Sequence, residues 1–421
     1  MSDQQPHHKF GGVVFTQLSV MMFLQFFVWG AWYVTMGPYM NSNGMSEAIA
    51  TAYTVGPIAA IVSPFFLGMI ADRFFASERV LAALHIIGGA ILCFAPTAAQ
   101  SSSILFIAAI LLHMLCYMPT LGLTSSLAMH NMTNSEKQFP MIRVFGTIGW
   151  IIANLVISQL KFDTSANMFY LAGGAGVLLG VFSFFLPHTP APSKGKPFSF
   201  RDALGLDSLV LLKRRSFAVF CLCSFLVCIP LSAYYAFAGT YVGEMGIEKI
   251  AQTMSFGQMS EIFFMLVMPF FFVRLGVKWM LAVGMLAWVI RYALFAMAAP
   301  DQVYWMILIG IALHGICYDF FFVTGQIYVD NESGPKIRGQ AQGFFVLLTQ
   351  GLGMLIGAQL MGVIFERSKN DLGVVDWKSL WIFPTIFALV VLIIFVLLFK
   401  HKKSSASEAE ISEQAEIPDP I

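Results

Sequence analysis

The chain has 421 residues, of which 58% are hydrophobic and only 11% are charged, and its formal net charge at pH 7 is +1. A soluble domain carries about 25% charged residues, so this composition excludes an ordinary soluble domain and predicts helices that use a lipid bilayer as their partner. The near-neutral charge gives no basis for nucleic-acid binding. The six cysteines fall in apolar stretches without zinc-ligand spacing, which predicts small buried residues rather than a metal site.

Twelve apolar stretches are long enough to cross a bilayer, for which about 20 residues are needed. The first stretch is too long for a cleavable signal peptide and is expected to remain as a spanning helix. The alternation typical of β-barrel strands is absent from the sequence, so the predicted fold class is an all-α membrane protein. In chain order the expected spans are 13–40, 50–71, 79–97, 103–127, 140–160, 168–186, 216–242, 252–273, 279–297, 303–328, 339–365 and 378–399.

These spans divide the chain into an N-terminal six-helix bundle at 1–187 and a C-terminal six-helix bundle at 216–400. Residues 188–215 open with prolines and end with a basic cluster, and they are the predicted linker between the bundles. The acidic, Ser-rich tail 401–421 is expected to be disordered. Most of the 24 Lys and Arg residues fall on the side of the membrane that carries the linker and both termini. The positive-inside rule therefore predicts that both termini are cytoplasmic.

Three short motifs of the first half recur in the same order, at nearly constant separation, in the second half. Such an internal repeat indicates two pseudo-symmetric half-bundles, the architecture of transporters that rock around a central site. The paired motifs are SPFF at 63–66 and MPFF at 268–271, HMLCY at 113–117 and HGICY at 314–318, and PMIR at 140–143 and PKIR at 335–338.

Four charged residues fall inside predicted spans, away from the helix ends: Arg143, Glu261, Arg291 and Asp319. Charges within a membrane are costly and mark functional sites by default. Asp319 and Glu261 are the candidates for proton coupling, because a buried carboxylate near a cation can switch between protonated and ionised states. The alternative for Asp319 is a permanent structural bridge to an arginine. We expect Arg291 to be the structural clamp for Glu261 or Asp319.

Polar residues also form stripes at helical spacing. Arg143, Thr147 and Trp150 fall at i, i+4 and i+7 of one span, although the echo of the PMIR motif in PKIR equally suggests that Arg143 sits at a cytoplasmic helix end. Gln258 and Glu261 fall at i and i+3, so both face one side of their helix, either toward a ligand or as a clamp between helices.

Two further spans carry candidate contacts for a ring-shaped ligand. Gln25 and Trp29 lie at i and i+4 in the first span, and His314 and Tyr318 share a face of the span 303–328. Aromatic residues in membrane helices serve more often for packing than for binding, and the repeat of His314 as His113 favours a structural role for it.

The second span ends in Gly68-Met69-Ile70-Ala71-Asp72-Arg73, which resembles the G-x-x-x-D-R signature of the major facilitator superfamily. In that reading Gly68, Asp72 and Arg73 form a conformational gate on the cytoplasmic face, and the alternative is an ordinary basic loop. The sequence contains no H-E-x-x-H, G-x-S-x-G or Walker A motif. We therefore expect no enzyme activity and no cofactor, and any uphill transport has to run on an ion gradient.

Several motifs spread over nearly the whole chain resemble the nucleoside:proton symporter family of bacterial major facilitator transporters. The resemblance implies the twelve-helix, two-bundle fold and a bacterial inner-membrane location. The motifs are FLQF at 23–26, WGAW at 29–32, YMPTLGL at 117–123, Ile142-Arg143 with GTIG at 146–149, LGLD at 204–207, Gln258-x-Ser260-Glu261, AW at 287–288 with Arg291 and ALFA at 293–296, and DFF at 319–321.

The resemblance also implies site residues, and it favours Arg143 as a member of the site. The family's substrate contacts correspond to Arg143, Thr147, Gln258, Glu261, Tyr318 and Asp319 of this chain. The chain departs from the family on the side that faces the base: Ser232 and Tyr235 replace polar amides, Trp150 replaces a Phe, and His314 replaces a Tyr.

Together these observations predict inward transport of a nucleoside with a proton by alternating access, by a chain that we expect to be a monomer. In this mechanism Gln258 and Glu261 bond the sugar or base, Trp150, Tyr318 and Trp29 enclose the rings, and Asp319 or Glu261 carries the proton. Two alternatives remain open. One is a facilitator or exporter of another hydroxylated solute, and the other is a membrane sensor that binds a solute without moving it.

Overall fold

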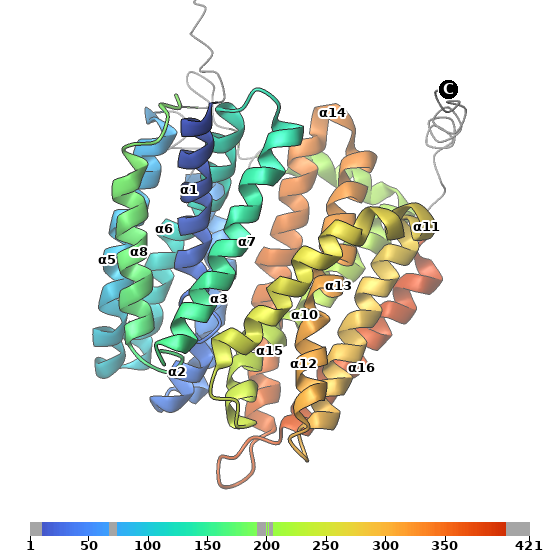
Figure 1. The fold of residues 1–421 in the computed structure, drawn as a ribbon. Helices are drawn as coiled ribbons and strands as arrows, with labels where there is room; N and C mark the ends of the chain where they lie inside the picture. Colours follow the sequence, from blue (N-terminus) through green and yellow to red (C-terminus); the bar gives the residue numbers. More distant parts are fainter. Residues whose placement is uncertain (1–10, 67–73, 192–198, 200, 202–204, 401–421) are drawn as a thin grey trace, which may run out of the picture.

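A computed structural model describes residues 11–66, 74–191, 199, 201 and 205–400. Helices make up nearly all of this part of the chain (Figure 1). Nine of the helices within it are long and apolar enough to cross a membrane. One of the nine, α11, contains two of the predicted spans, and α3 and α8 occupy the positions of two others. The all-α membrane fold predicted from the sequence is therefore confirmed.

The first half of the chain forms a bundle in which small residues bring helices close together. A Cβ atom added to Gly89 would lie only 2.6 Å from the carbonyl oxygen of Gly173, so only glycine allows this approach of α5 to α8. The elements are α1 (Gly12–Gly30), α2 (Met36–Ser42), the 3-10 turn η1 (Ser46–Ala48), α3 (Ile49–Phe66), α5 (Ser77–Ser101), α6 (Ser103–His130), α7 (Ser135–Gln159) and α8 (Asn167–Ser183).

In the second half, predicted spans are joined into longer helices that turn at glycines. Gly276 inside α11 and Gly334 inside α14 have positive φ values of 64° and 67°, and each lies between two predicted spans. The elements are η3 (Leu206–Lys213), α10 (Arg215–Glu244), α11 (Ile250–Ala298), α12 (Tyr304–Ala312), α13 (His314–Tyr318), the π-helical turn η4 (Asp319–Val323), α14 (Thr324–Val346), the π-helical turn η5 (Leu347–Gly353), α15 (Met354–Arg367) and α16 (Trp377–Leu398).

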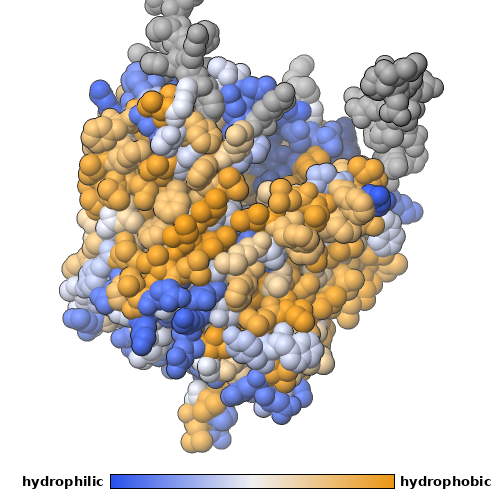
Figure 2. Space-filling view, in the orientation of Figure 1, coloured by the Kyte–Doolittle hydropathy of each residue, from blue (hydrophilic) through white to orange (hydrophobic). Residues whose placement is uncertain are grey.

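The outer surface is suited to lipid. Figure 2 shows hydrophobic residues across the middle of one face and hydrophilic residues gathered toward its two ends. Large apolar side chains such as Leu266 and Val273 on α11 are about three-quarters exposed, at 76% and 75%. In water this surface would be unfavourable, whereas hydrocarbon solvates it.

The first predicted span, 13–40, was expected to be one helix, and this prediction is wrong. Helix α1 ends at Gly30 and α2 begins at Met36, with turns in between. Pro38 is one cause, because it has no N–H for the carbonyl of Val34 and its ring clashes with that carbonyl in a regular helix.

The linker is anchored to the helices at both of its ends. At its start, the Thr189 amide donates to Glu78 at the beginning of α5 over 3.0 Å. Toward its end, Asp207 and Gln340 exchange two hydrogen bonds of 3.1 and 3.0 Å. Hydrogen bonds from Arg201 and then Gln340 hold the pKa of Asp207 below its usual range. The predicted gate residues Gly68, Asp72 and Arg73 and the tail 401–421 lie outside the described residues, and the predicted domain boundaries stay predictions.

The two halves meet through α7 with α11, α3 with α15 and α2 with α10. A polar clasp closes the end opposite to the start of α1 (Figure 1). Buried Asp163, after α7, accepts hydrogen bonds from Ser158 at 2.7 Å and from the backbone N–H of Ala251 at 2.8 Å. Ser158 in turn accepts the N–H of Gln252 at 2.9 Å. The first half therefore caps the N-terminus of α11 in the second half.

We expect Asp163→Ala to loosen this clasp. Removing the carboxylate leaves the Ala251 N–H without its acceptor, at a cost of about 1–3 kcal/mol, so hydrogen exchange of that amide should accelerate by about tenfold or more. Exchange measured by mass spectrometry on peptides that start at α11 checks this result. Asp371→Ala, in the exposed loop before α16, is the matched control. Equal exchange in both variants would show that the clasp does not hold the halves together.

Candidate substrate and proton site

The core of the candidate site lies where α7 of the first half faces α11 of the second. Arg143 on α7 is half-buried, with its guanidinium carbon 4.1 Å from the centre of the Phe26 ring. Glu261 on α11 has a side chain that is only 16% exposed. The guanidinium charge of Arg143 acts electrostatically on Glu261 and on the Tyr318 hydroxyl of α13. Among the described residues no hydrogen bond or ion pair joins Arg143 to either of them, so the three lie in one region of the α7–α11 interface without direct contact.

The neighbouring residues on α7 and α11 extend this site. Thr147 lies one turn beyond Arg143 and is half-buried. Gln258 lies one turn before Glu261, and its side-chain oxygen is buried without a hydrogen-bond partner among the described residues. An amide and a carboxylate on one helix face, opposite a guanidinium, offer both donors and acceptors to a ligand with hydroxyl groups.

His314 connects Glu261 to an aromatic stack. Its Nε2 lies 3.9 Å from a Glu261 carboxylate oxygen, and its ring is stacked on Tyr234 with centroids 5.5 Å apart and an interplanar angle of 18°. The His314 ring also contacts Tyr318 at 5.9 Å. Its Nδ1 is buried and has no partner among the described residues. His314 is therefore adjacent both to Glu261 and to the rings of Tyr234 and Tyr318, all four being residues of the second half.

Asp319 is placed differently from Glu261. It is the first residue of the π-helical turn η4 and is fully buried. Neither carboxylate oxygen has a hydrogen-bond partner among the described residues, although the charges of Asp319 and Glu261 interact. The Asp–Arg bridge that was the structural alternative is absent from the described part of the chain. Single π-turns inside helices occur often at functional sites.

Arg291 does not clamp a carboxylate, so that expectation is wrong. Its Nε donates to the carbonyl of Gly310 at 2.9 Å, and its guanidinium carbon lies 4.2 Å from the centre of the Tyr234 ring. No ion pair joins Arg291 to Glu261 or Asp319, all three being described residues. A carbonyl dipole and the negative face of the ring stabilise the cation instead. The spacing of residues along the sequence does not show whether a carboxylate, a carbonyl or an aromatic ring lies nearest to the Arg291 guanidinium.

An aromatic wall, formed by Trp29, Tyr33, Trp150 and Tyr235, spans both halves. Trp29 and Trp150 are 5.5 Å apart between ring centroids, and Tyr33 contacts Trp150 at 6.4 Å. Tyr33 also reaches Tyr235 on α10 of the second half at 5.9 Å. Tyr33 was not among the predicted site residues, although its spacing of four residues from Trp29 indicates that the two rings share one helix face. The wall combines two predicted residues of the first half with one of the second.

Two of the predicted residues lie inside the bundles instead. Gln25 is fully buried, and its side chain is held by Thr120 and His85, each at 2.7 Å. Ser232 bonds the carbonyl of Ile229 on its own helix at 2.6 Å and packs against Gly357 of α15. Both side chains use their hydrogen-bonding capacity within or between helices of one half.

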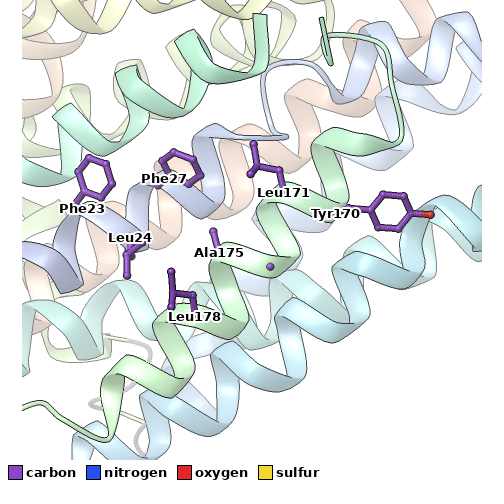
Figure 3. A pocket seen from close by; sticks show the side chains of 8 residues that line it. Phe23, Leu24, Phe27, Tyr170, Leu171, Ala175 and Leu178 are labelled. Atoms are coloured by element: carbon purple, nitrogen blue, oxygen red, sulfur yellow. The ribbon is translucent and has the colours of Figure 1, made fainter. Parts of the chain in front are cut away.

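An apolar groove lies between α1 and α8, away from this site. Figure 3 shows its lining, with Phe23 and Phe27 from α1 and Leu171 and Leu178 from α8 among the labelled residues. None of the predicted site residues lines it. Its chemistry matches hydrocarbon rather than a polar solute.

Comparison with known proteins identifies the family of the chain. The sequence model of the family described as "Nucleoside H+ symporter" matches residues 13–404. Escherichia coli YegT is 38% identical, covering 94% of this chain and 96% of the relative, and the nucleoside permease NupG of Escherichia coli is 32% identical, covering 92% and 96%. A crystal structure of the nucleoside transporter NupG has a TM-score of 0.82 at 31% identity and covers 92% of this chain and 100% of that one. The chain therefore belongs to the nucleoside H+ symporter family of the major facilitator superfamily.

Proposed function

We propose that this protein moves a nucleoside inward together with a proton across a bacterial inner membrane, by alternating access between the two halves. The observation that carries the proposal is that Arg143 and Glu261 come from helices of different halves that pack on each other, and that an aromatic wall also spans both halves. A ligand bound there contacts both halves, so its affinity depends on how the halves are oriented. Only such differential affinity couples binding to a change of orientation.

The roles of the residues follow from their chemistry. Arg143, Gln258 and Glu261 supply charged and amide groups for sugar hydroxyls and base edges. Trp29, Trp150 and Tyr235 supply ring faces for the base, since aromatic rings favour stacked or edge-to-face contact. Glu261 and Asp319 are the groups that bind the proton. The clasp lies at the outer end when both termini are placed in the cytoplasm, which makes this conformation closed toward the outside.

The relatives support nucleosides as the substrate class. The names of NupG and of the xanthosine permease of Escherichia coli, the latter 31% identical over 91% of this chain, both give nucleosides as cargo. At the base-facing positions, however, this chain has Tyr235 and Trp150 in the aromatic wall and Ser232 turned into the α15 contact. We therefore propose that base recognition relies on ring contacts more than on amide hydrogen bonds.

The test is flux into liposomes that contain the purified full chain, with radiolabelled nucleosides and an imposed proton gradient. We expect accumulation that a protonophore abolishes. Arg143→Met should reduce it by about tenfold or more, because a hydrogen bond to a charged group contributes about 1.5–3 kcal/mol. Arg274→Met, at an exposed cation over Phe270, is the matched control and should transport normally.

The alternatives give different results in the same assay. Nucleoside flux that ignores the proton gradient would indicate a facilitator. Binding without flux would indicate a sensor, and flux of sugars but not nucleosides would indicate another hydroxylated cargo. Each of these outcomes contradicts proton-coupled nucleoside uptake.

A further inference from the structure

The break in the first span has a second cause besides Pro38. The hydroxyl of Tyr53, on α3, donates a hydrogen bond to the carbonyl of Tyr33 at 2.8 Å. The same oxygen accepts the backbone N–H of Gly37 at 3.3 Å. Residues 33 and 37 are the pair that would bond directly in an α-helix. A side-chain hydroxyl is therefore inserted into the backbone ladder, which is a recognised cause of helix kinks.

The two arms on either side of the break differ in their main partners: α1 contacts only helices of the first half to any extent, whereas α2 contacts the second half as well as α3 of the first. Helix α1 packs on α7, α8 and α6 of the first half. Helix α2 packs on α10 of the second half, where a Cβ atom on Gly37 would lie 3.0 Å from both the Ala236 carbonyl oxygen and the Thr240 hydroxyl. Asn41 at the end of α2 also donates to Glu244 at 3.1 Å. A relative movement of the halves would therefore change the backbone conformation of the segment between α1 and α2.

The break also holds a residue of the aromatic wall. Tyr33 lies within the turns between the arms, and its ring contacts Tyr53 at 5.3 Å, Trp150 at 6.4 Å and Tyr235 at 5.9 Å. Straightening the segment would rotate Tyr33 about the helix axis and away from these rings. The geometry of the break therefore fixes one side of the candidate site.

We propose that the segment between α1 and α2 is a hinge of the transport cycle, and that Tyr53 is its positioning residue, which bridges the opened ladder and sets Tyr33 in the aromatic wall. A bridging hydroxyl keeps both backbone groups bonded while their separation changes, which a direct N–H to carbonyl bond does not allow. Of the measurements that test this proposal, only nucleoside flux rests on the proposed function.

Two variants test the hinge. Tyr53→Phe removes the bridge but leaves the proline, whereas Pro38→Ala combined with Tyr53→Phe removes both causes of the break and lets the helix close. Tyr241→Phe is the matched control, because the buried Tyr241 hydroxyl also donates to one backbone carbonyl, that of Phe295 at 2.9 Å, away from the break. All variants are measured as the full chain, by hydrogen exchange in residues 31–42 and by nucleoside flux.

Tyr53→Phe should accelerate exchange of the Gly37 amide by about tenfold, the equivalent of one buried hydrogen bond. The double variant should protect that amide beyond the wild type and yet transport about tenfold more slowly at saturating nucleoside. If the hydrogen bond of Tyr53 only stabilised the fold, the double variant should transport faster than Tyr53→Phe, because its continuous helix replaces the lost hydrogen bond. Tyr241→Phe should change neither the exchange in residues 31–42 nor the flux.

A readout of the clasp separates this inference from the proposed function. The amides of Ala251 and Gln252, which Asp163 and Ser158 hold, become free to exchange when the halves part at that end. The hinge predicts slower exchange of both amides in the double variant, even if no nucleoside is carried. The hinge is overturned if the double variant shows wild-type hydrogen exchange both in residues 31–42 and at the amides of Ala251 and Gln252. Wild-type nucleoside flux in the double variant also overturns it.

Discussion

Glu261→Gln is expected to abolish accumulation of nucleoside against its gradient. Glu261 is a carboxylate on α11 whose side chain is 16% exposed, and the charge of Arg143 on the adjacent helix α7 acts on it. Glutamine keeps the shape and a hydrogen-bonding oxygen, but it neither carries charge nor binds a proton. Uptake into liposomes with an inward proton gradient should therefore stop at the equilibrium concentration ratio.

Exchange of labelled for unlabelled nucleoside separates lost coupling from lost binding. Because the glutamine amide still bonds hydroxyl groups, exchange across the membrane should continue in Glu261→Gln while accumulation does not. Glu366→Gln is the matched control, at the exposed end of α15 where Glu366 pairs with Lys369 at 2.7 Å. Surface pairs of this kind contribute about 0–1 kcal/mol. Normal accumulation in Glu261→Gln would exclude this carboxylate as the coupling group.

Patterns that depend on one helix at a time were readable from the sequence. The apolar lengths predicted the spans, and the spacing of Arg143, Thr147 and Trp150 predicted one face of α7. The spacing of Gln258 and Glu261 likewise predicted one face of α11. Because α7 and α11 pack on each other, helical spacing was sufficient to place these candidate residues on two neighbouring helices, and their roles stay predictions.

Features that depend on a second helix were not readable in the same way. The break in the first span needs the hydroxyl of Tyr53, which comes from α3. The surroundings of Arg291 need Tyr234 from α10 and Gly310 from α12. In both cases a single sequence gives the polar group but not its partner, and the partner decides the conformation. Pro38 was the one local signal for the break, but a prediction of spans from the length of apolar stretches does not take a proline into account.

Among the described residues of the second half, one carboxylate is fully buried, that of Asp319, and neither of its oxygens has a hydrogen-bond partner there. Arg291 is stabilised by a carbonyl and a ring rather than by Asp319. Isolated ionised carboxylates in an apolar interior are costly enough that the group binds a proton or recruits a cation. Asp319 is therefore the carboxylate that we propose binds a proton in this conformation, and because the charge of Glu261 acts on it, we propose that the two form one proton-binding pair.

Asp319→Asn is expected to raise the thermal stability of the protein and to abolish proton coupling. The neutral amide replaces a fully buried carboxylate whose two oxygens have no hydrogen-bond partner among the described residues, so folding no longer bears the cost of burying that charge or of protonating it. The same change removes a site for the proton. Thermal unfolding in detergent should show a higher Tm, and nucleoside addition should no longer drive proton entry into liposomes.

The two readouts together distinguish a functional charge from a structural one. A carboxylate that held the fold together would lower the Tm when replaced, since breaking a buried polar contact is destabilising. Asp301→Asn, in the exposed turn before α12, is the matched control and should leave both Tm and coupling unchanged. A lower Tm in Asp319→Asn would mean that the carboxylate has a stabilising partner in the folded protein. Nucleoside-driven proton entry that persists in this variant would leave Glu261 as the only proton carrier of the pair, because the asparagine at 319 has no titratable proton to exchange.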